Sequence, residues 1–239
     1  MNPATLLRQL PNAVTLGNGF CGLAAVLLFM QAPGVDALAG TLDAAFLLIA
    51  LGVLCDTLDG PLARVLKAND PLGAQLDSLC DGATFGVATA LVVAGSFWTF
   101  SPLLAGALAA WWLAAVLVRL ARFNLDTDTS VPHLYFSGMC SPVAALFVVA
   151  ALAASAGTPA FPWLPIALAL LLPALMLSRL VFADLPKHYL ARRRSPLDLA
   201  VSAIAMFFLP PASVVALFLT AFTLQTAVAN ARGKHAARA

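Results

Sequence analysis

Long apolar stretches, separated by short polar segments, occupy most of this 239-residue chain. They are rich in leucine and alanine and do not alternate between apolar and polar positions, so they predict helices and not strands. Six of them are each about 20 residues long, which is the length that a helix needs to cross a bilayer. These stretches cover about residues 13–31, 41–63, 73–97, 102–123, 137–156 and 162–181.

A seventh apolar stretch, from about 197 to 230, is interrupted by Pro210 and Pro211. It is either one kinked span or a hairpin of two short helices, because proline breaks the hydrogen-bond pattern of a helix. The basic residues favour the hairpin, since they collect in five clusters: before the first stretch and after the second, fourth, sixth and last. All five clusters lie on the cytoplasmic side only if the last stretch crosses the membrane twice. We therefore predict an all-α polytopic membrane protein with six core helices and a C-terminal hairpin, about eight spans in total, and with both termini cytoplasmic.

Composition excludes a water-soluble globular protein. Hydrophobic residues make up 62% of the chain and charged residues only 10%, whereas soluble domains carry about 25% charged residues. We predict a single membrane domain over residues 1–239, with its core at about 11–181 and the hairpin at about 197–230. The four cysteines have no CxxC spacing and are expected to be small packing residues. We expect a multi-pass protein of a bacterial inner membrane, and the net charge of +2 gives no indication of a nucleic-acid partner.

Aspartate is the only acidic residue type in the chain, and it is concentrated around the polar segment after the second stretch. Asp56 and Asp59 are three residues apart, and Asp77 and Asp81 are four apart, so each pair lies on one helix face. A short turn joins the two helices, which makes them antiparallel and lets the pairs converge. Clustered carboxylates repel one another unless protons or cations are present. The sequence therefore predicts a site for Mg²⁺ or Mn²⁺, with two ions, because these cations prefer oxygen ligands.

Small residues and an arginine accompany the aspartates. Gly60 lies inside a helix, where glycine costs about 1 kcal/mol relative to alanine, and close approach to a ligand would account for it. Ala63 and Gly73 leave further room, and Arg64 could neutralise a phosphate oxygen. Together these residues favour metal-assisted phosphoryl chemistry at the cytoplasmic membrane surface.

The same residues resemble the signature of the CDP-alcohol phosphatidyltransferases at all eight of its fixed positions. The matching motif is Asp56-x-x-Asp59-Gly60-x-x-Ala63-Arg64, followed by Gly73, Asp77 and Asp81. The resemblance implies transfer of a phosphatidyl group from a CDP-linked lipid to an alcohol, with release of CMP, and it implies a homodimer. It also implies that all four aspartates bind metal, that Asp81 is the general base, and that Gly60, Ala63 and Arg64 hold the CDP portion; we add Gly73 to this CDP set.

Further stretches resemble the integral-membrane phosphatidylserine synthase branch of that family. They are Pro11-Asn12-x-x-Thr15-x-x-Asn18-x-x-Cys21-Gly22, Arg119-x-x-Arg122-Phe123-Asn124, Phe136-x-Gly138-x-x-Ser141-Pro142 and Leu175-x-x-Ser178-Arg179. One position departs from the branch, because Cys140 stands where proline is expected. The resemblance implies CDP-diacylglycerol and L-serine as substrates.

Two groups of residues are candidates for contact with these substrates. Asn12, Thr15 and Asn18 either contact the CDP portion or only form hydrogen bonds within the first helix. Serine carries a carboxylate and an ammonium group, and the candidates to recognise it on the cytoplasmic side are Arg119, Arg122 and Asn124. Other acceptors left open are glycerol 3-phosphate, an inositol phosphate and choline. A cation transporter that uses the aspartates as its ion site is a distant alternative.

Overall fold

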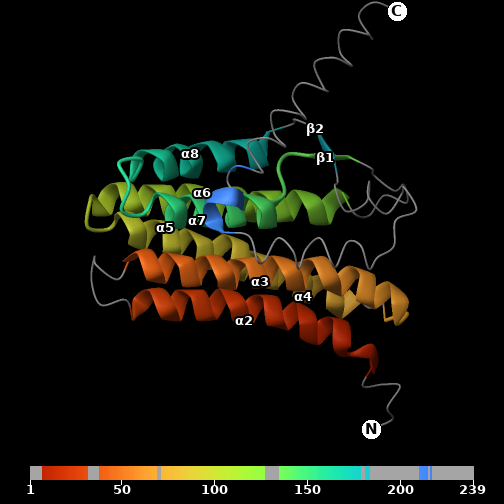
Figure 1. Ribbon diagram of the computed structural model, residues 1–239. Coiled ribbons are helices and arrows are strands. Elements are labelled where there is room, and N and C mark those ends of the chain that lie inside the picture. Colours follow the sequence, from red (N-terminus) through yellow and green to blue (C-terminus); the bar gives the residue numbers. More distant parts are fainter. Residues whose placement is uncertain are drawn as a thin grey trace, which may run out of the picture.

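The computed structural model describes residues 7–31, 38–68, 71–126, 135–178, 181–183, 210–214 and 216. These residues form a helical bundle (Figure 1), which confirms the predicted helical class. The helices are α2 (Leu10–Met30), α3 (Leu38–Val65), α4 (Pro71–Asp81), η2 (Gly82–Ala88), α5 (Thr89–Phe97), α6 (Pro102–Asp126), α7 (Ser141–Ser155) and α8 (Trp163–Leu177). Two three-residue strands, β1 (Tyr135–Ser137) and β2 (Val181–Ala183), pair antiparallel with Phe136 opposite Phe182. The sequence pattern gives no sign of this pair, which joins the segments before α7 and after α8.

Within the part of the chain that the structure describes, four helical segments are long and apolar enough to cross a membrane. They are α2, α3, the continuous α4–η2–α5 helix and α6. In contrast, α7 and α8 have 15 residues each, or about 22 Å at 1.5 Å per residue, which is shorter than the roughly 30 Å hydrocarbon core. The expected spans at 137–156 and 162–181 are therefore shorter helices in the structure. The predicted hairpin at 197–230 lies, except for 210–214 and 216, outside the described residues, so the arrangement of eight spans stays a prediction.

Helix α7 forms the centre of the hydrophobic core. It packs against α3, α5, η2 and α8, and its residues from Ala144 to Leu152 are all buried. A helix that is apolar on every side needs such surroundings, because no face of it is suited to water. Trp112 of α6 is fully buried nearby and donates a 2.8 Å hydrogen bond to the carbonyl of Phe85. The core therefore fixes η2 between α6 and α7.

The chain reverses its direction from one long helical segment to the next, so α3 and α6 both end at the same end of the bundle (Figure 1). Both α2 and α7 begin at this end, which we call the polar end. Arg64 and Arg119 lie near the ends of α3 and α6, respectively. The bundle thus brings Arg64 and Arg119 to the end where the aspartates of α3 and α4 lie.

The turn into α7 depends on Gly138. Its φ of +86° is a conformation that only glycine adopts easily, and a Cβ atom there would collide with the carbonyl oxygen of Met176. Cys140 follows with φ −69° and ψ 133°, which proline can also adopt. The cysteine in place of the expected proline therefore requires no change in the path of the backbone.

Candidate active site

Three carboxylates converge at the polar end of the bundle. Asp56 comes from α3, and Asp77 and Asp81 come from successive turns of α4. One carboxylate oxygen of each lies within 4.8 Å of the others. Helix α2 packs against both α3 and α4, and this arrangement brings together carboxylates that are separated by a turn in the sequence. Three negative groups at this distance require protons or a cation, since like charges in an apolar setting repel strongly.

Asp59 is not in this group of three. Its buried carboxylate accepts a 2.7 Å hydrogen bond from the hydroxyl of Thr15. The Thr15 hydroxyl is also 3.1 Å from the carbonyl oxygen of Pro11. Asp59 therefore lies next to the three carboxylates but is directed toward α2, and its expected role as a metal ligand stays a prediction.

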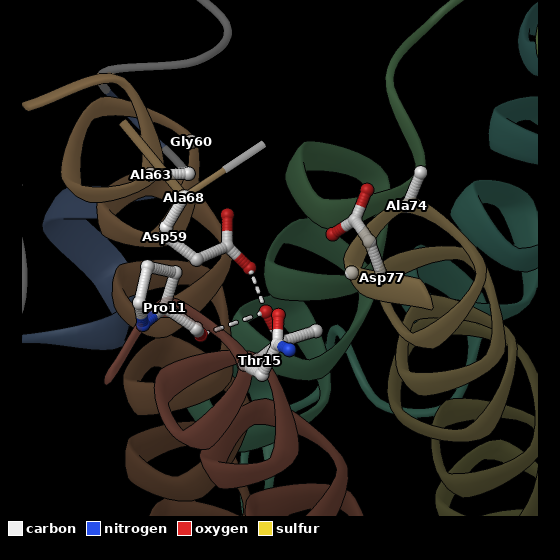
Figure 2. Close-up of a pocket in the computed structure, with 10 residues that line it drawn as sticks. Pro11, Thr15, Asp59, Gly60, Ala63, Ala68, Ala74 and Asp77 are labelled. Carbon is white, nitrogen blue, oxygen red and sulfur yellow. Dashed lines mark hydrogen bonds between the residues drawn. The ribbon is translucent and has the colours of Figure 1, made fainter. Parts of the chain in front are cut away.

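A cavity of about 220 Å³ opens between α2, α3 and α4. Figure 2 shows Asp59 and Asp77 on opposite sides of it, with Thr15 between them. The ten residues that line it are Pro11, Asn12, Thr15, Asp59, Gly60, Ala63, Ala68, Gly73, Ala74 and Asp77. Most of them are small, and the cavity adjoins the carboxylate cluster through Asp77. This arrangement suits an anionic ligand that is held partly by cations and partly by close contact with the backbone.

The cavity divides the expected CDP-binding residues into two groups. Asn12, Thr15, Gly60, Ala63 and Gly73 line it, whereas Arg64 and Asn18 are not among its lining residues. Arg64 is exposed at the end of α3, and Asn18 is completely buried.

Three lining residues, Pro11, Ala68 and Ala74, were not among the candidate site residues. Pro11 belongs to the motif of the first helix, whereas Ala68 and Ala74 lie between and beside the signature positions. The small size of Ala74, directly after Gly73, is a signal that could have identified it. A Cβ atom at Gly60 would meet nothing within 4 Å, so helix packing does not require glycine at this position. Because Gly60 lines the cavity, the missing side chain leaves room there for a ligand.

Asn18 contacts the general-base candidate directly. Its side-chain nitrogen Nδ2 donates a 3.1 Å hydrogen bond to Oδ1 of Asp81. Its backbone carbonyl accepts a 2.8 Å hydrogen bond from the hydroxyl of Thr84 in η2. The π-helical segment η2 begins directly after Asp81, and such segments frequently occur at functional sites. Neither η2 nor the Asn18–Asp81 contact is evident from the sequence pattern.

The three candidates for acceptor binding have different surroundings. Arg119 is partly buried, donates a 2.7 Å hydrogen bond to the hydroxyl of Ser141, and is close enough to interact electrostatically with both Asp56 and Asp81. The guanidinium of Arg122 is exposed and donates to the carbonyl of Leu177 at 3.1 Å.

Asn124 contacts α4. Its side-chain oxygen accepts a 3.0 Å hydrogen bond from Ser78, the residue after Asp77. Of the three candidates, Arg119 is thus the one whose charge acts directly on the carboxylate cluster.

The donor set at the cluster suits a hard divalent cation. Mg²⁺ and Mn²⁺ prefer carboxylate oxygens, and Asp56, Asp77 and Asp81 together offer such oxygens without competing thiolate or imidazole ligands in their group. When bound there, a divalent cation would neutralise phosphate charge and polarise the phosphorus for attack.

Comparisons with known proteins agree with this site. The family model described as CDP-alcohol phosphatidyltransferase matches residues 8–175. A CDP-diacylglycerol--serine O-phosphatidyltransferase of Bacillus subtilis is 30% identical over 187 residues, which cover 76% of this chain and 94% of that protein. One of Mycobacterium tuberculosis (strain H37Rv) is 34% identical over 151 residues, covering 62% of this chain and 50% of that protein.

An archaeal relative extends the comparison to another serine-named enzyme. An archaetidylserine synthase of Methanothermobacter thermautotrophicus is 33% identical over 143 residues, which cover 58% of this chain and 55% of that protein. The matched part of this chain corresponds to about half the length of the mycobacterial relatives. The matched residues include every signature position from Asp56 to Asp81. On the extent of the family match and the relation to the Bacillus protein, the chain belongs to the CDP-alcohol phosphatidyltransferase family.

Proposed function

We propose that this protein transfers the phosphatidyl group of CDP-diacylglycerol to the hydroxyl of L-serine, giving phosphatidylserine and CMP. The observation that carries the proposal is the convergence of Asp56, Asp77 and Asp81 beside a cavity that Gly60 and Gly73 of the same signature help to line. Acidic ligands for cations next to a small-residue pocket are what a diphosphate needs for binding and activation.

The reaction is a substitution at the lipid-proximal phosphorus. The oxygen of the serine hydroxyl forms the new bond to that phosphorus, and the bond from the phosphorus to the oxygen bridging to CMP breaks. The proton of the hydroxyl passes to Asp81, and CMP leaves with the bridging oxygen. A general base in this position contributes about 10²–10⁴-fold to the rate.

The cavity is the proposed place for the CDP portion. Its wall contains Gly60, Ala63 and Gly73, where the backbone allows close approach, and Asn12 and Thr15 add polar groups from α2. Arg64, which is exposed near the cavity's α3 wall, is the proposed partner of a phosphate oxygen. Asp56, Asp59, Asp77 and Asp81 are the proposed ligands of two Mg²⁺ or Mn²⁺ ions.

Serine is the proposed acceptor for two reasons. The relatives with 30–34% identity carry serine acceptors in their names, and Arg119 supplies a cation beside the cluster for the serine carboxylate. A phosphorylated acceptor such as glycerol 3-phosphate or an inositol phosphate would need further cations beside Arg119, whereas the guanidinium of Arg122 is exposed and donates to the carbonyl of Leu177. We assign Arg122 and Asn124 supporting roles at the same acceptor site.

The proposed setting is a bacterial inner membrane with the polar end of the bundle on the cytoplasmic side. There the site would meet soluble serine and release CMP, while CDP-diacylglycerol would enter from the lipid. In this proposal residues 1–239 form one membrane domain of about eight spans, and two copies form a homodimer.

The deciding experiment uses the purified full-length protein in detergent or liposomes with CDP-diacylglycerol and Mn²⁺ or Mg²⁺. Serine, glycerol 3-phosphate, an inositol phosphate and choline are supplied separately, and CMP release and the lipid product are measured. Serine-dependent CMP release with phosphatidylserine is expected. Release with a different alcohol alone would overturn the acceptor. Movement of Mn²⁺ across liposomes without CMP release would instead indicate a transporter.

A further inference from the structure

We propose that Asn18 is a positioning residue for Asp81: it holds Oδ1 of that carboxylate and leaves the second oxygen for the cation and the acceptor hydroxyl. This inference rests on the proposed function, because it assumes that Asp81 is the general base. It replaces, for Asn18, both alternatives that the sequence leaves open, which are contact with the CDP portion and hydrogen bonding only within the first helix.

The surroundings of Asn18 support a role that acts through Asp81. The side chain is completely buried and is absent from the residues that line the cavity, whereas Asn12 and Thr15 on the same helix line it. Its described side-chain hydrogen bond goes from Nδ2 to Oδ1 of Asp81 at 3.1 Å. Asn18 therefore contacts the carboxylate cluster and not the space available to a nucleotide.

The other end of the amide provides an independent observation. Among the described residues, Oδ1 of Asn18 is the one buried side-chain nitrogen or oxygen atom that has no hydrogen-bond partner. Such an atom destabilises the folded state, because water's hydrogen bonds are lost without replacement. An apolar side chain at this position would avoid that cost. The buried amide is thus explained by what its nitrogen does for Asp81.

Two neighbouring helices, η2 and α3, and close packing on its own helix α2 fix the position of Asn18. Thr84 in η2 donates to the backbone carbonyl of Asn18 at 2.8 Å. On α3, a Cβ atom at Gly52 would lie 3.0 Å from Oδ1 of Asn18. On α2, a Cβ atom at Gly22 would lie 2.6 Å from the Thr84 hydroxyl oxygen. Close packing at these two glycines therefore holds Asn18, and through it Asp81, in one place.

The chemistry of an amide suits this task. An asparagine side chain donates through Nδ2 at every pH at which the protein is folded, so it can hold one carboxylate oxygen in place without carrying a charge of its own. Aspartate at position 18 has nearly the same shape but no donor, and it would add a negative charge to the cluster. Leucine has a similar volume and neither donor nor charge.

The test is a double-mutant cycle on Mn²⁺ affinity, measured by electron paramagnetic resonance of free Mn²⁺ with the purified full-length protein. N18L in the wild-type background is expected to weaken Mn²⁺ binding about 10–100-fold, the usual effect of losing a partner of a metal ligand. In a D81N background the same substitution should change the affinity less than about twofold, because the carboxylate it acts on is gone. Equal losses in the two backgrounds would overturn the proposal.

Kinetic constants and a packing control complete the test. N18L is expected to lower kcat about 10–100-fold and to leave KM for CDP-diacylglycerol within about twofold, and N18D is expected to lower kcat further. A rise in KM with kcat unchanged would assign Asn18 to nucleotide contact instead. S96A, which removes another buried hydrogen bond (2.7 Å to the Val92 carbonyl), should leave Mn²⁺ affinity and both kinetic constants unchanged. An equal loss of Mn²⁺ affinity in S96A would indicate a general packing effect and overturn the inference.

The failure of the proposed function would look different. In that case the wild-type protein would release no CMP with any alcohol, although the cycle between Asn18 and Asp81 could still be measured on Mn²⁺ binding. If the wild-type enzyme is active and the cycle is additive, only the role of Asn18 is overturned.

Discussion

Thr15 on α2 donates a 2.7 Å hydrogen bond to Asp59 on α3, 44 residues further along the chain. Both side chains are buried and both line the cavity. The bond directs Asp59 toward α2, whereas Asp56, one helical turn earlier, lies in a group with two carboxylates of α4. Two aspartates of the same signature therefore have different surroundings, and their substitutions should have different effects.

Thr15→Val should raise KM for CDP-diacylglycerol about 10–100-fold. Valine has nearly the same shape but lacks the hydroxyl, so Asp59 loses a hydrogen bond of the charged kind, worth about 1.5–3 kcal/mol. The measurement is CMP release as a function of CDP-diacylglycerol at saturating serine. Thr57→Val is the matched control, because the Thr57 hydroxyl donates only to Val53 of its own helix at 2.7 Å. An equal rise in the control would mean that the effect is not specific to Asp59.

Asp56→Asn and Asp77→Asn should each weaken Mn²⁺ binding about tenfold or more. Each removes a charged oxygen from the group of three, and hard cations depend on such oxygens. Asp59→Asn should weaken binding less, since its carboxylate is directed toward Thr15. Titration of Mn²⁺ followed by electron paramagnetic resonance checks the order of the three variants. The largest loss of Mn²⁺ affinity in Asp59→Asn would contradict this account of the cluster.

Removal of divalent cations with EDTA should abolish CMP release, and added Mn²⁺ or Mg²⁺ should restore it.

Asp81→Asn should lower turnover about 10²–10⁴-fold, the contribution of a general base. The amide cannot accept the proton of the serine hydroxyl, but its oxygen can still bind a cation. Mn²⁺ binding should therefore survive in part while serine-dependent CMP release is nearly lost. Single-turnover CMP release and Mn²⁺ titration on the same preparation separate the two effects. Turnover like that of the wild type would exclude Asp81 as the base.

The sequence was sufficient to predict the long helices and the meeting of three of the four signature aspartates, Asp56, Asp77 and Asp81. An unbroken apolar run of 20 or so residues has few alternatives to a helix, and the structure has α3 at Leu38–Val65 where the pattern predicts 41–63. Helical spacing then places Asp77 and Asp81 on one face, and a short connection brings that face to Asp56. These are local rules, which act over a few residues at a time.

Features that depend on contacts between distant segments could not be predicted in this way. The direction of the Asp59 carboxylate depends on Thr15, which is 44 residues away in the sequence. The role of Asn18 depends on Asp81, which is 63 residues away. The π-helical turn η2 has the same apolar pattern as an α-helix, so hydrophobicity does not distinguish the two. The apolar run at 137–156 predicts a helix but does not fix its length, which in α7 is set by the turn at Gly138.

Gly22 and Gly60 should have different roles: Gly22 allows close helix packing, and Gly60 leaves room in the cavity for the ligand. Gly22→Ala should destabilise the protein by about 1–3 kcal/mol through overpacking, because its Cβ atom would lie 2.8 Å from Cα of Thr84. Gly60→Ala should not destabilise it, since the new methyl group meets nothing within 4 Å, but should raise KM for CDP-diacylglycerol by narrowing the cavity. Gly106→Ala, also with open space around it, is the control for both. Thermal unfolding and KM measured on the three variants check this division, and a Gly60 variant with lowered stability and unchanged KM would contradict it.

Arg119→Gln should raise KM for serine about 10–100-fold and leave KM for CDP-diacylglycerol nearly unchanged. Its guanidinium is held by Ser141 at 2.7 Å and acts on Asp56 and Asp81, so its loss removes the cation proposed to bind the serine carboxylate, an interaction of about 1.5–3 kcal/mol.

Initial rates over a range of serine concentrations, at saturating CDP-diacylglycerol, measure the effect. Arg119→Lys should recover part of the loss, because it restores the charge without the planar geometry of the guanidinium. Lys67→Gln removes an exposed charge at the same polar end and should change neither constant, which controls for the general attraction of anions to this surface. If KM for CDP-diacylglycerol rises while KM for serine stays constant, Arg119 serves the donor lipid and the acceptor site must lie elsewhere.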